Sequence, residues 1–135
     1  MLENGFTKIL IVDDSPKIRQ HLIEMLTADS NGIRVIGTTG RVSEARDLID
    51  QHKPHIITLD LQLEDGNGLD LLRLVKQSSN GETKGFTPKV IVLTNHSGLP
   101  FQEKCKLYGA DVFLDKATEF EKIRQVVLQL AEGGL

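Results

Sequence analysis

Hydrophobic residues recur in two different patterns that take turns along the chain. Five short segments are apolar on consecutive positions and rich in β-branched residues, which is typical of strands covered on both faces. These segments are KILIV (8–12), RVIGT (34–38), HIITL (55–59), KVIVL (89–93) and the weaker DVFL (111–114). Between them, apolar residues return at spacings of three and four positions, which predicts amphipathic helices.

The intervening segments also carry signals for helix ends. Ser15 can cap a helix that has Pro16 at its first position, and we expect this helix to end near residues 29–32. Ser43 is the expected cap of the second helix. The remaining helices are expected after Gly68, from about Pro100, and over an apolar stripe of Phe120, Ile123, Val127 and Leu130.

Strict alternation of strands and helices defines the expected fold. It predicts parallel pairing through right-handed crossovers, and therefore a doubly wound α/β domain with a five-stranded parallel sheet and five helices. The length of 135 residues has room for one domain, which we expect to span residues 1–135 with tails at 1–6 and 131–135. The one long linker, SSNGETKGFTP (78–88), is expected to be a surface loop.

Composition and charge narrow the functional classes. The chain is 39% hydrophobic and 26% charged with a net charge of -3, which is ordinary for a soluble globular protein and offers no basic surface for nucleic acid. Cys105 is the sole cysteine, so no internal disulfide can form. The longest apolar run, ILIV, is far too short to span a membrane, and the start MLENGFTK lacks the apolar region of a secretory signal. We therefore expect a reduced, cytoplasmic protein.

Polar residues that follow the predicted strands indicate a site. In doubly wound sheets, ligands bind beyond the carboxyl ends of the strands. Asp13 and Asp14 follow the first strand, Asp60 the third, Thr94 ends the fourth, and Lys116 follows the fifth. Converging carboxylates repel one another unless a divalent cation lies among them, and Mg²⁺ prefers such oxygen ligands. With the metal in place, the acid after the third strand could attack a phosphoryl group, while the threonine and the lysine assist.

At these residues the chain resembles the receiver domain of two-component response regulators, the family of the chemotaxis response regulator. The resemblance spans nearly the whole chain and rests on four motifs in order: ILIVDDSP, ITLDLQLEDGNGLDLL, VIVLTNHS and GADVFLDKATEFEKI. Each motif alone is weak, but their order at successive strand ends is specific. The resemblance implies a flavodoxin-like receiver fold with strand order 2-1-3-4-5.

The resemblance also implies roles for individual residues. Asp60 would accept a phosphoryl group from a histidine kinase or a histidine phosphotransfer protein, so the chain would catalyse its own phosphorylation and dephosphorylation rather than turn over an external substrate. Mg²⁺ would be held by Asp13, Asp14, Asp60 and the backbone carbonyl of Gln62. Thr94 would be the switch hydroxyl, Phe113 the switch aromatic and Lys116 the phosphate-binding lysine. A downstream partner or a second copy would bind the face made by the fourth helix, fifth strand and fifth helix.

Three positions depart from the family pattern. Glu64 stands where proline is frequent four residues after the acceptor, so we expect a less constrained and more acidic loop. Asn95 follows Thr94 where a smaller residue is usual and could narrow access to Asp60. Ala117 replaces a proline that follows the lysine, and we expect a trans bond there because a cis bond before a non-proline residue costs about 2.5 to 4 kcal/mol.

Simpler interpretations exist for each residue and for the whole chain. An isolated acidic pair is commonly a solvated loop, an isolated lysine a surface charge, and a lone Phe113 a core residue. A flavodoxin-like cofactor binder would need a glycine-rich and hydroxyl-rich loop where the chain has DDSP, and a phosphatase with an aspartyl intermediate would need a substrate-covering cap. A receiver-like interaction module that acts without phosphorylation remains the main alternative. The kinase, the output partner and the choice between a stand-alone receiver and part of a longer regulator stay open.

Overall fold

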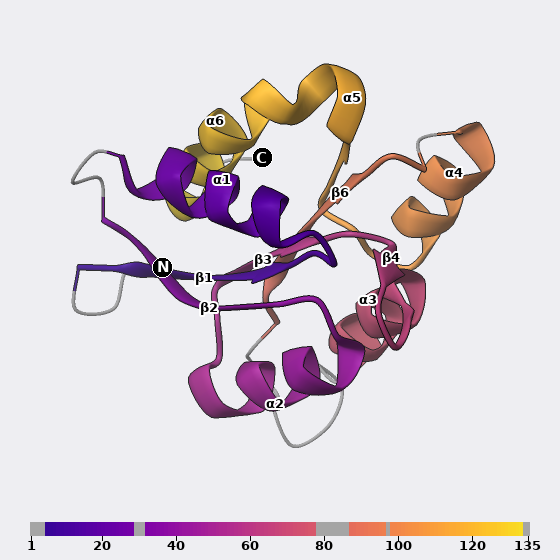
Figure 1. The fold of residues 1–135 in the computed structure, drawn as a ribbon, viewed down its shortest axis with the longest axis horizontal. Helices are drawn as coiled ribbons and strands as arrows, with labels where there is room; N and C mark the ends of the chain where they lie inside the picture. The colour runs from indigo at the N-terminus through magenta and orange to yellow at the C-terminus, as the bar shows by residue number, and fades with distance from the viewer. Residues whose placement is uncertain (1–4, 29–31, 78–86, 97, 134–135) are drawn as a thin grey trace.

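The computed structural model describes residues 5–28, 32–77, 87–96 and 98–133. Five strands form one parallel sheet in the order β2-β1-β3-β6-β7 (Figure 1). Their bounds are Thr7–Val12 for β1, Ile33–Thr39 for β2, Ile56–Leu59 for β3, Lys89–Thr94 for β6 and Val112–Asp115 for β7. Counted along the chain, this is the predicted order 2-1-3-4-5, so the doubly wound fold is confirmed.

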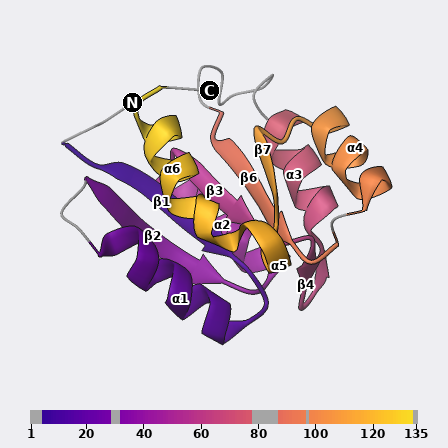
Figure 2. The same ribbon diagram turned by 90° about the horizontal axis from the view of Figure 1, so that it is seen from above.

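Helices cover both faces of the sheet. Their bounds are Pro16–Thr27 for α1, Val42–His52 for α2, Gly68–Gln77 for α3, Leu99–Leu107 for α4, Lys116–Glu119 for α5 and Ile123–Ala131 for α6. Figure 2 shows α1 and α6 on the same face of the sheet, with α3 and α4 toward the edge formed by β6 and β7. The predicted fifth helix is divided, because a 3₁₀ turn at Phe120–Lys122 separates α5 from α6.

The core consists of two layers, one on each side of the sheet. Ile9 and Ile11 of β1 pack with residues of α1 and α6, whereas Leu10 and Val12 pack with residues of α2 and α3. Alternate side chains of one strand therefore enter different layers, which explains why the strands are apolar on consecutive positions. Cys105 lies fully buried in the layer of α3 and α4, and burial raises the pKa of its thiol to about 11.

The helix caps were predicted with mixed success. The Ser15 hydroxyl accepts a hydrogen bond from the Ile18 N–H at 3.2 Å, so the predicted cap of α1 is confirmed. The predicted cap at Ser43 is wrong: α2 begins at Val42, and Ser43 lies inside its first turn. A carboxylate from a distant loop, Asp65, takes the capping role.

The ends of several predicted segments can be compared with the structure. Helix α1 ends at Thr27, and residues 29–31 of its predicted end lie outside the described residues. The same holds for residues 78–86 of the predicted linker and for residues 1–4 and 134–135 of the predicted tails. Ala131, the first residue of the predicted C-terminal tail, ends α6. Across the described ranges, every helix is too short or too polar to cross a membrane.

Candidate functional site

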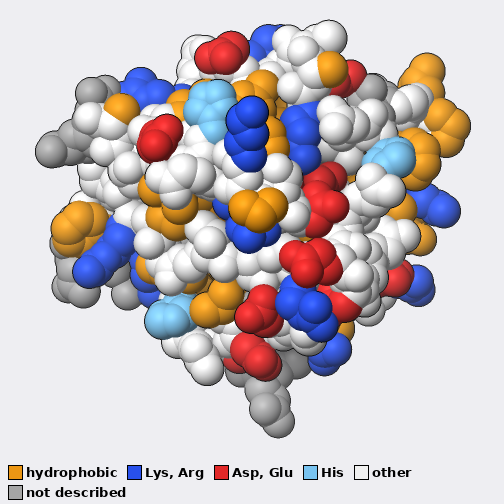
Figure 3. All heavy atoms as spheres, in the orientation of Figure 1, with side chains coloured by type: hydrophobic (Ala, Val, Ile, Leu, Met, Phe, Trp, Pro, Cys, Tyr) orange, Lys and Arg blue, Asp and Glu red, His pale blue; other side chains and the backbone are white. Residues whose placement is uncertain are grey.

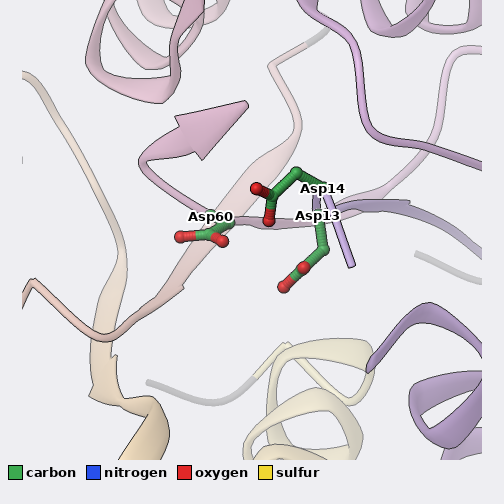
Figure 4. A group of neighbouring side chains, drawn as sticks. All are labelled: Asp13, Asp14 and Asp60. Carbon is green, nitrogen blue, oxygen red and sulfur yellow. The ribbon is translucent and has the colours of Figure 1, made fainter. Parts of the chain in front are cut away.

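Three carboxylates meet at the carboxyl edge of the sheet. Asp13 follows β1 and Asp60 follows β3, and both are almost fully buried, whereas Asp14 is exposed. One oxygen of each of the three residues lies within 4.8 Å of the others (Figure 4). The convergence predicted from the ends of two strands is thus present, and it concentrates negative charge in a partly buried place.

A single lysine lies between two of these acids. The Lys116 ammonium Nζ is 2.7 Å from Asp13 Oδ2 and 3.0 Å from Asp60 Oδ2. The pairing of Thr94 with Asp115 in the sheet places Lys116 one residue beyond the same edge. No cis peptide bond occurs in the described residues, so the bond between Lys116 and Ala117 is trans, as predicted.

The charges at this site are only partly balanced. Burial raises the pKa of Asp13 above its ordinary value, and this outweighs the hydrogen bonds from Lys116 and from the Ser15 N–H; the nearby Asp60 charge acts in the same direction as burial. Burial alone would lower the pKa of Lys116, but its hydrogen bonds to Asp13 and Asp60 raise it. The two shifts are compatible because one ammonium is shared by two buried carboxylates. The lysine stays charged, but its single positive charge does not neutralise the negative charges of the three carboxylates.

Backbone contacts hold the two halves of the acidic cluster together. The Asp60 N–H donates to the Val12 carbonyl at 2.9 Å, which joins the end of β3 to the end of β1. Asp13 Oδ1 accepts from the Ser15 N–H at 2.9 Å, and the Asp13 carbonyl accepts from Arg19 Nη1 at 2.6 Å. The sequence pattern gave no sign of this role for Arg19, because its position on the helix identifies no partner.

A short hairpin follows Asp60 and was not predicted. Strands β4 (Gln62–Leu63) and β5 (Gly66–Asn67) pair antiparallel and turn at residues 64–65. The Gly68 N–H donates to the Leu61 carbonyl at 2.8 Å, and a Cβ on Gly68 would collide with the Asp60 carbonyl oxygen. Glycine at position 68 therefore lets the chain close tightly after the acidic residue. The Gln62 N–H lies 3.4 Å from Asp60 Oδ1, and the metal-binding role of its carbonyl stays a prediction.

The tip of this hairpin is attached to the loop between β2 and α2. The Glu64 N–H donates to the Gly40 carbonyl at 2.9 Å. The Asp65 carboxylate accepts hydrogen bonds from the Val42 and Ser43 N–H groups and from the Ser43 hydroxyl. These contacts constrain the loop, while the expectation that it is less constrained than a loop with proline stays a prediction. The expectation of a more acidic loop holds.

The other predicted residues lie in or directly after β6 and β7. Thr94 is fully buried, and its hydroxyl accepts from the His96 N–H at 3.1 Å. Val92 pairs with Phe113, and alternation along the strands places Phe113 on the same face of the sheet as Thr94. The half-buried Phe113 lines a cavity of about 370 Å³ between β7 and α4. Asn95 is exposed, and its predicted effect on access to Asp60 stays a prediction.

A doubly wound α/β domain that carries three acids, a lysine and a threonine at the carboxyl edge of its sheet has the architecture of a phosphoryl-accepting signalling domain. The model of the response regulator receiver domain family matches residues 9–128. The chain belongs to this family, whose members act in two-component phosphorelay signalling.

Curated relatives are longer than this chain. A protein-glutamate methylesterase/protein-glutamine glutaminase of Methanospirillum hungatei is 31% identical over 121 residues, which cover 88% of this chain and 33% of that protein. A protein with the same description from Nitrosospira multiformis is 37% identical over 84 residues, which cover 62% of this chain and 22% of that protein. The chain thus spans a third or less of the length of these relatives.

Solved structures agree on the fold. The beryllofluoride-activated DrrB receiver domain has a TM-score of 0.78 at 28% identity, and the matched region covers 94% of this chain and 98% of the DrrB chain. The receiver domain of the response regulator NarL from Mycobacterium tuberculosis has a TM-score of 0.82 at 22% identity, and the matched region covers 96% of this chain and 98% of the NarL chain. At that lower identity the likeness shows the fold alone.

Proposed function

We propose that this receiver domain stores a phosphoryl group on Asp60, taken from the phosphohistidine of a histidine kinase or a histidine phosphotransfer protein. The observation that carries this proposal is the position of the buried Asp60 carboxylate, which lies 3.0 Å from the Lys116 ammonium and has an oxygen within 4.8 Å of oxygens of Asp13 and Asp14. A carboxylate oxygen would attack phosphorus, the bond from phosphorus to the histidine nitrogen would break, and the imidazole would leave. The product would be an acyl phosphate on the domain.

The acidic cluster fits a hard divalent cation, and we propose Mg²⁺. Three carboxylate oxygens within 4.8 Å of one another supply the ligand type that Mg²⁺ prefers, and the backbone carbonyl of Gln62 would add a fourth. The Lys116 ammonium contacts two of these three carboxylates, so one positive charge faces three negative charges, and burial raises the pKa of Asp13. When bound, the cation would neutralise oxygens of the incoming phosphoryl group.

Two other side chains would assist the transfer. Lys116 already has its ammonium 3.0 Å from Asp60 Oδ2, so it can pair with an oxygen of a phosphoryl group attached there. The Thr94 hydroxyl lies at the end of the neighbouring strand and would donate to another such oxygen. The Thr94 hydroxyl oxygen accepts a hydrogen bond from the His96 N–H. The hydroxyl proton of Thr94 can therefore turn toward the phosphoryl group.

Signalling would proceed from Thr94 to a protein-binding face. Thr94 and Phe113 share one face of the sheet, and Phe113 lines the cavity beside α4. Movement of the threonine toward the phosphoryl group would vacate space for the aromatic ring and change the surface of α4, β7 and the α5–α6 segment. Exposed Leu99 and Leu107 on α4 supply apolar area for a downstream partner or a second copy. We further propose that residues 1–135 form a single domain that works in the cytoplasm and does not bind nucleic acid directly.

The test is phosphorylation with a small donor. Incubation of the wild-type chain with Mg²⁺ and acetyl phosphate should add one phosphoryl group, detected by intact mass and mapped to Asp60. Asp60→Asn should remove this adduct, whereas the control Asp70→Asn, which neutralises an exposed acid of α3, should retain it. An equal adduct on Asp60→Asn would refute the acceptor assignment. A wild-type chain that takes no phosphate yet binds its partner would favour the interaction module that acts without phosphorylation.

A further inference from the structure

We propose that Asp65 is a positioning residue of the metal-binding site: it holds the β4–β5 hairpin against the start of α2 and thereby fixes the segment that follows the phosphoryl acceptor. This inference rests on the proposed function, because it concerns the same site. Asp65 is outside the cluster of three carboxylates, and it lies on the hairpin turn five positions beyond Asp60. Its role would be indirect, through the backbone it holds.

The attachment consists of three hydrogen bonds to one carboxylate. Asp65 accepts from the N–H groups of Val42 and Ser43 at the first turn of α2, and from the Ser43 hydroxyl at 2.9 Å. The residue in the ordinary capping position is Arg41, which makes no side-chain capping bond. The start of α2 is therefore capped from another loop, and the cap joins the helix to the hairpin. Hydrogen bonds from the helix, foremost from the Val42 N–H, lower the pKa of Asp65, so it stays ionised at neutral pH.

The loop that receives this hairpin also contacts the acidic pair. The Asp13 N–H donates to the Thr39 carbonyl at 2.9 Å, and the Glu64 N–H donates to the Gly40 carbonyl at 2.9 Å. The end of β2 and the loop that follows it thus contact both parts of the metal site. One part is the loop of Asp13 and Asp14, and the other is the hairpin that begins after Asp60.

Gly40 lies against groups from each of these parts. A Cβ at this position would lie 2.5 Å from Glu64 Oε2, 2.9 Å from Arg19 Nη1 and 3.1 Å from Asp14 Cα. The same Arg19 donates to the Asp13 carbonyl. A displacement of the hairpin tip would therefore disturb the groups that surround both acids of the first loop.

The hairpin needs an external attachment because it is very small. Each of its strands has two residues, and a two-stranded ribbon of this size has little stability of its own. Gln62 lies in its first strand, so loss of the Asp65 contacts should let the Gln62 backbone and the adjoining Asp60 sample other orientations. Metal affinity should fall, because ligands that must first be ordered bind more weakly than ligands held in place.

The experiment compares Mg²⁺ affinity in full-length variants by calorimetry. Asp65→Ala should weaken Mg²⁺ binding on the order of 10-fold, the usual size for loss of a residue that orients metal ligands. Asp65→Asn keeps one acceptor oxygen and should recover part of the affinity. Phosphorylation by acetyl phosphate should slow in Asp65→Ala at low Mg²⁺ and recover at saturating Mg²⁺. The control Asp70→Ala removes the same charge from the exposed surface of α3 and should bind Mg²⁺ nearly as the wild type does.

Different failures have different meanings. A lower melting temperature in Asp65→Ala with Mg²⁺ affinity equal to that of Asp70→Ala would show a helix cap alone and overturn the positioning role. If Asp65→Ala does not fold, Ser43→Ala removes one of the three hydrogen bonds and should give a smaller loss of Mg²⁺ affinity; unchanged affinity there, together with unchanged affinity in Asp65→Asn, would likewise overturn it. A wild-type chain that binds no Mg²⁺ would overturn the proposed metal site and this inference together.

Discussion

Both ends of the sheet carry a cluster of charged side chains, but the charges are balanced differently at the two ends. At the end where β6 and β7 begin, the Asp111 carboxylate contacts two ammonium groups, that of Lys76 at 2.8 Å and that of Lys89 at 3.8 Å. The same carboxylate accepts from the Val90 N–H at 2.8 Å. At the opposite end, three carboxylates gather, and two of them, Asp13 and Asp60, share the ammonium of Lys116.

This difference separates a structural contact from a binding site. The Asp111 cluster satisfies its single negative charge with groups of the chain itself, and it links α3 to the start of two strands. The acidic cluster leaves negative charge uncompensated, which is unfavourable for stability unless a cation from solution joins it. Figure 3 shows acidic side chains gathered at right of centre, on the side where the strands of Figure 1 end. The excess of negative charge makes this edge of the sheet suitable for a metal ion and, with the metal bound, for a phosphoryl group.

Removal of one lysine from each end should sharpen the contrast most. Lys116→Ala removes the sole cation between two buried carboxylates and should lower the free energy of unfolding by about 3 kcal/mol without Mg²⁺. Lys76→Ala leaves Asp111 with Lys89 and the Val90 N–H, so about 1 kcal/mol should be lost. Urea unfolding with and without Mg²⁺ measures both effects.

The metal response provides the discriminating result for these two variants. Mg²⁺ should restore much of the stability of Lys116→Ala, because it supplies the missing positive charge at the acidic cluster. It should leave Lys76→Ala unchanged apart from the effect seen in the wild type. Equal responses of the two variants to Mg²⁺ would contradict the distinction between the two ends.

A smaller effect is expected from pH in the absence of metal. Because burial raises the pKa of Asp13, the folded state binds its proton more readily than the unfolded state does. Stability should therefore rise as the pH falls through the raised pKa of folded Asp13 toward 3.8, the value of the unfolded chain. The pKa of Asp65 is lowered, so its contribution is present above 3.8 and is lost as the pH falls through the lower value of the folded state.

Urea unfolding between pH 7 and pH 3 should thus show a maximum at mildly acidic pH. Asp13→Asn removes the titrating group and should flatten the rise, while the loss at lower pH remains. Saturating Mg²⁺ should also suppress the rise, because the metal competes with the proton for Asp13. A wild-type profile that falls steadily below pH 7 would show that Asp13 is not destabilised by its surroundings.

The sequence predicted the fold and the acidic cluster because both depend on repeated, local signals. Five apolar segments identified the strands, and parallel strands bring their carboxyl ends to one edge. The strand order implied by the resemblance placed the first and third strands side by side, which brings Asp13 and Asp60 together. The β4–β5 hairpin escaped prediction because strands of two residues show no periodicity.

The cap of α2 shows why other parts could not be predicted. Ser43 carries the usual local signal for a helix start, yet the capping carboxylate comes from Asp65, more than twenty positions away along the chain. The same limit applies to Arg19, whose contact with the Asp13 carbonyl depends on how helix α1 packs. A contact that depends on how helices and loops pack leaves no pattern in a single chain.

The most direct test of the uncompensated acidic cluster is a Mg²⁺ titration followed by amide chemical shifts in NMR. We predict saturable shifts at Asp13, Asp14, Asp60 and Gln62, with Asp111 and Val90 unchanged at the other end of the sheet. This result would locate the missing cation where the chain leaves negative charge unbalanced. Shifts of equal size at Asp111, or none at Asp13 and Asp60 at millimolar Mg²⁺, would contradict the assignment of this edge as the metal site.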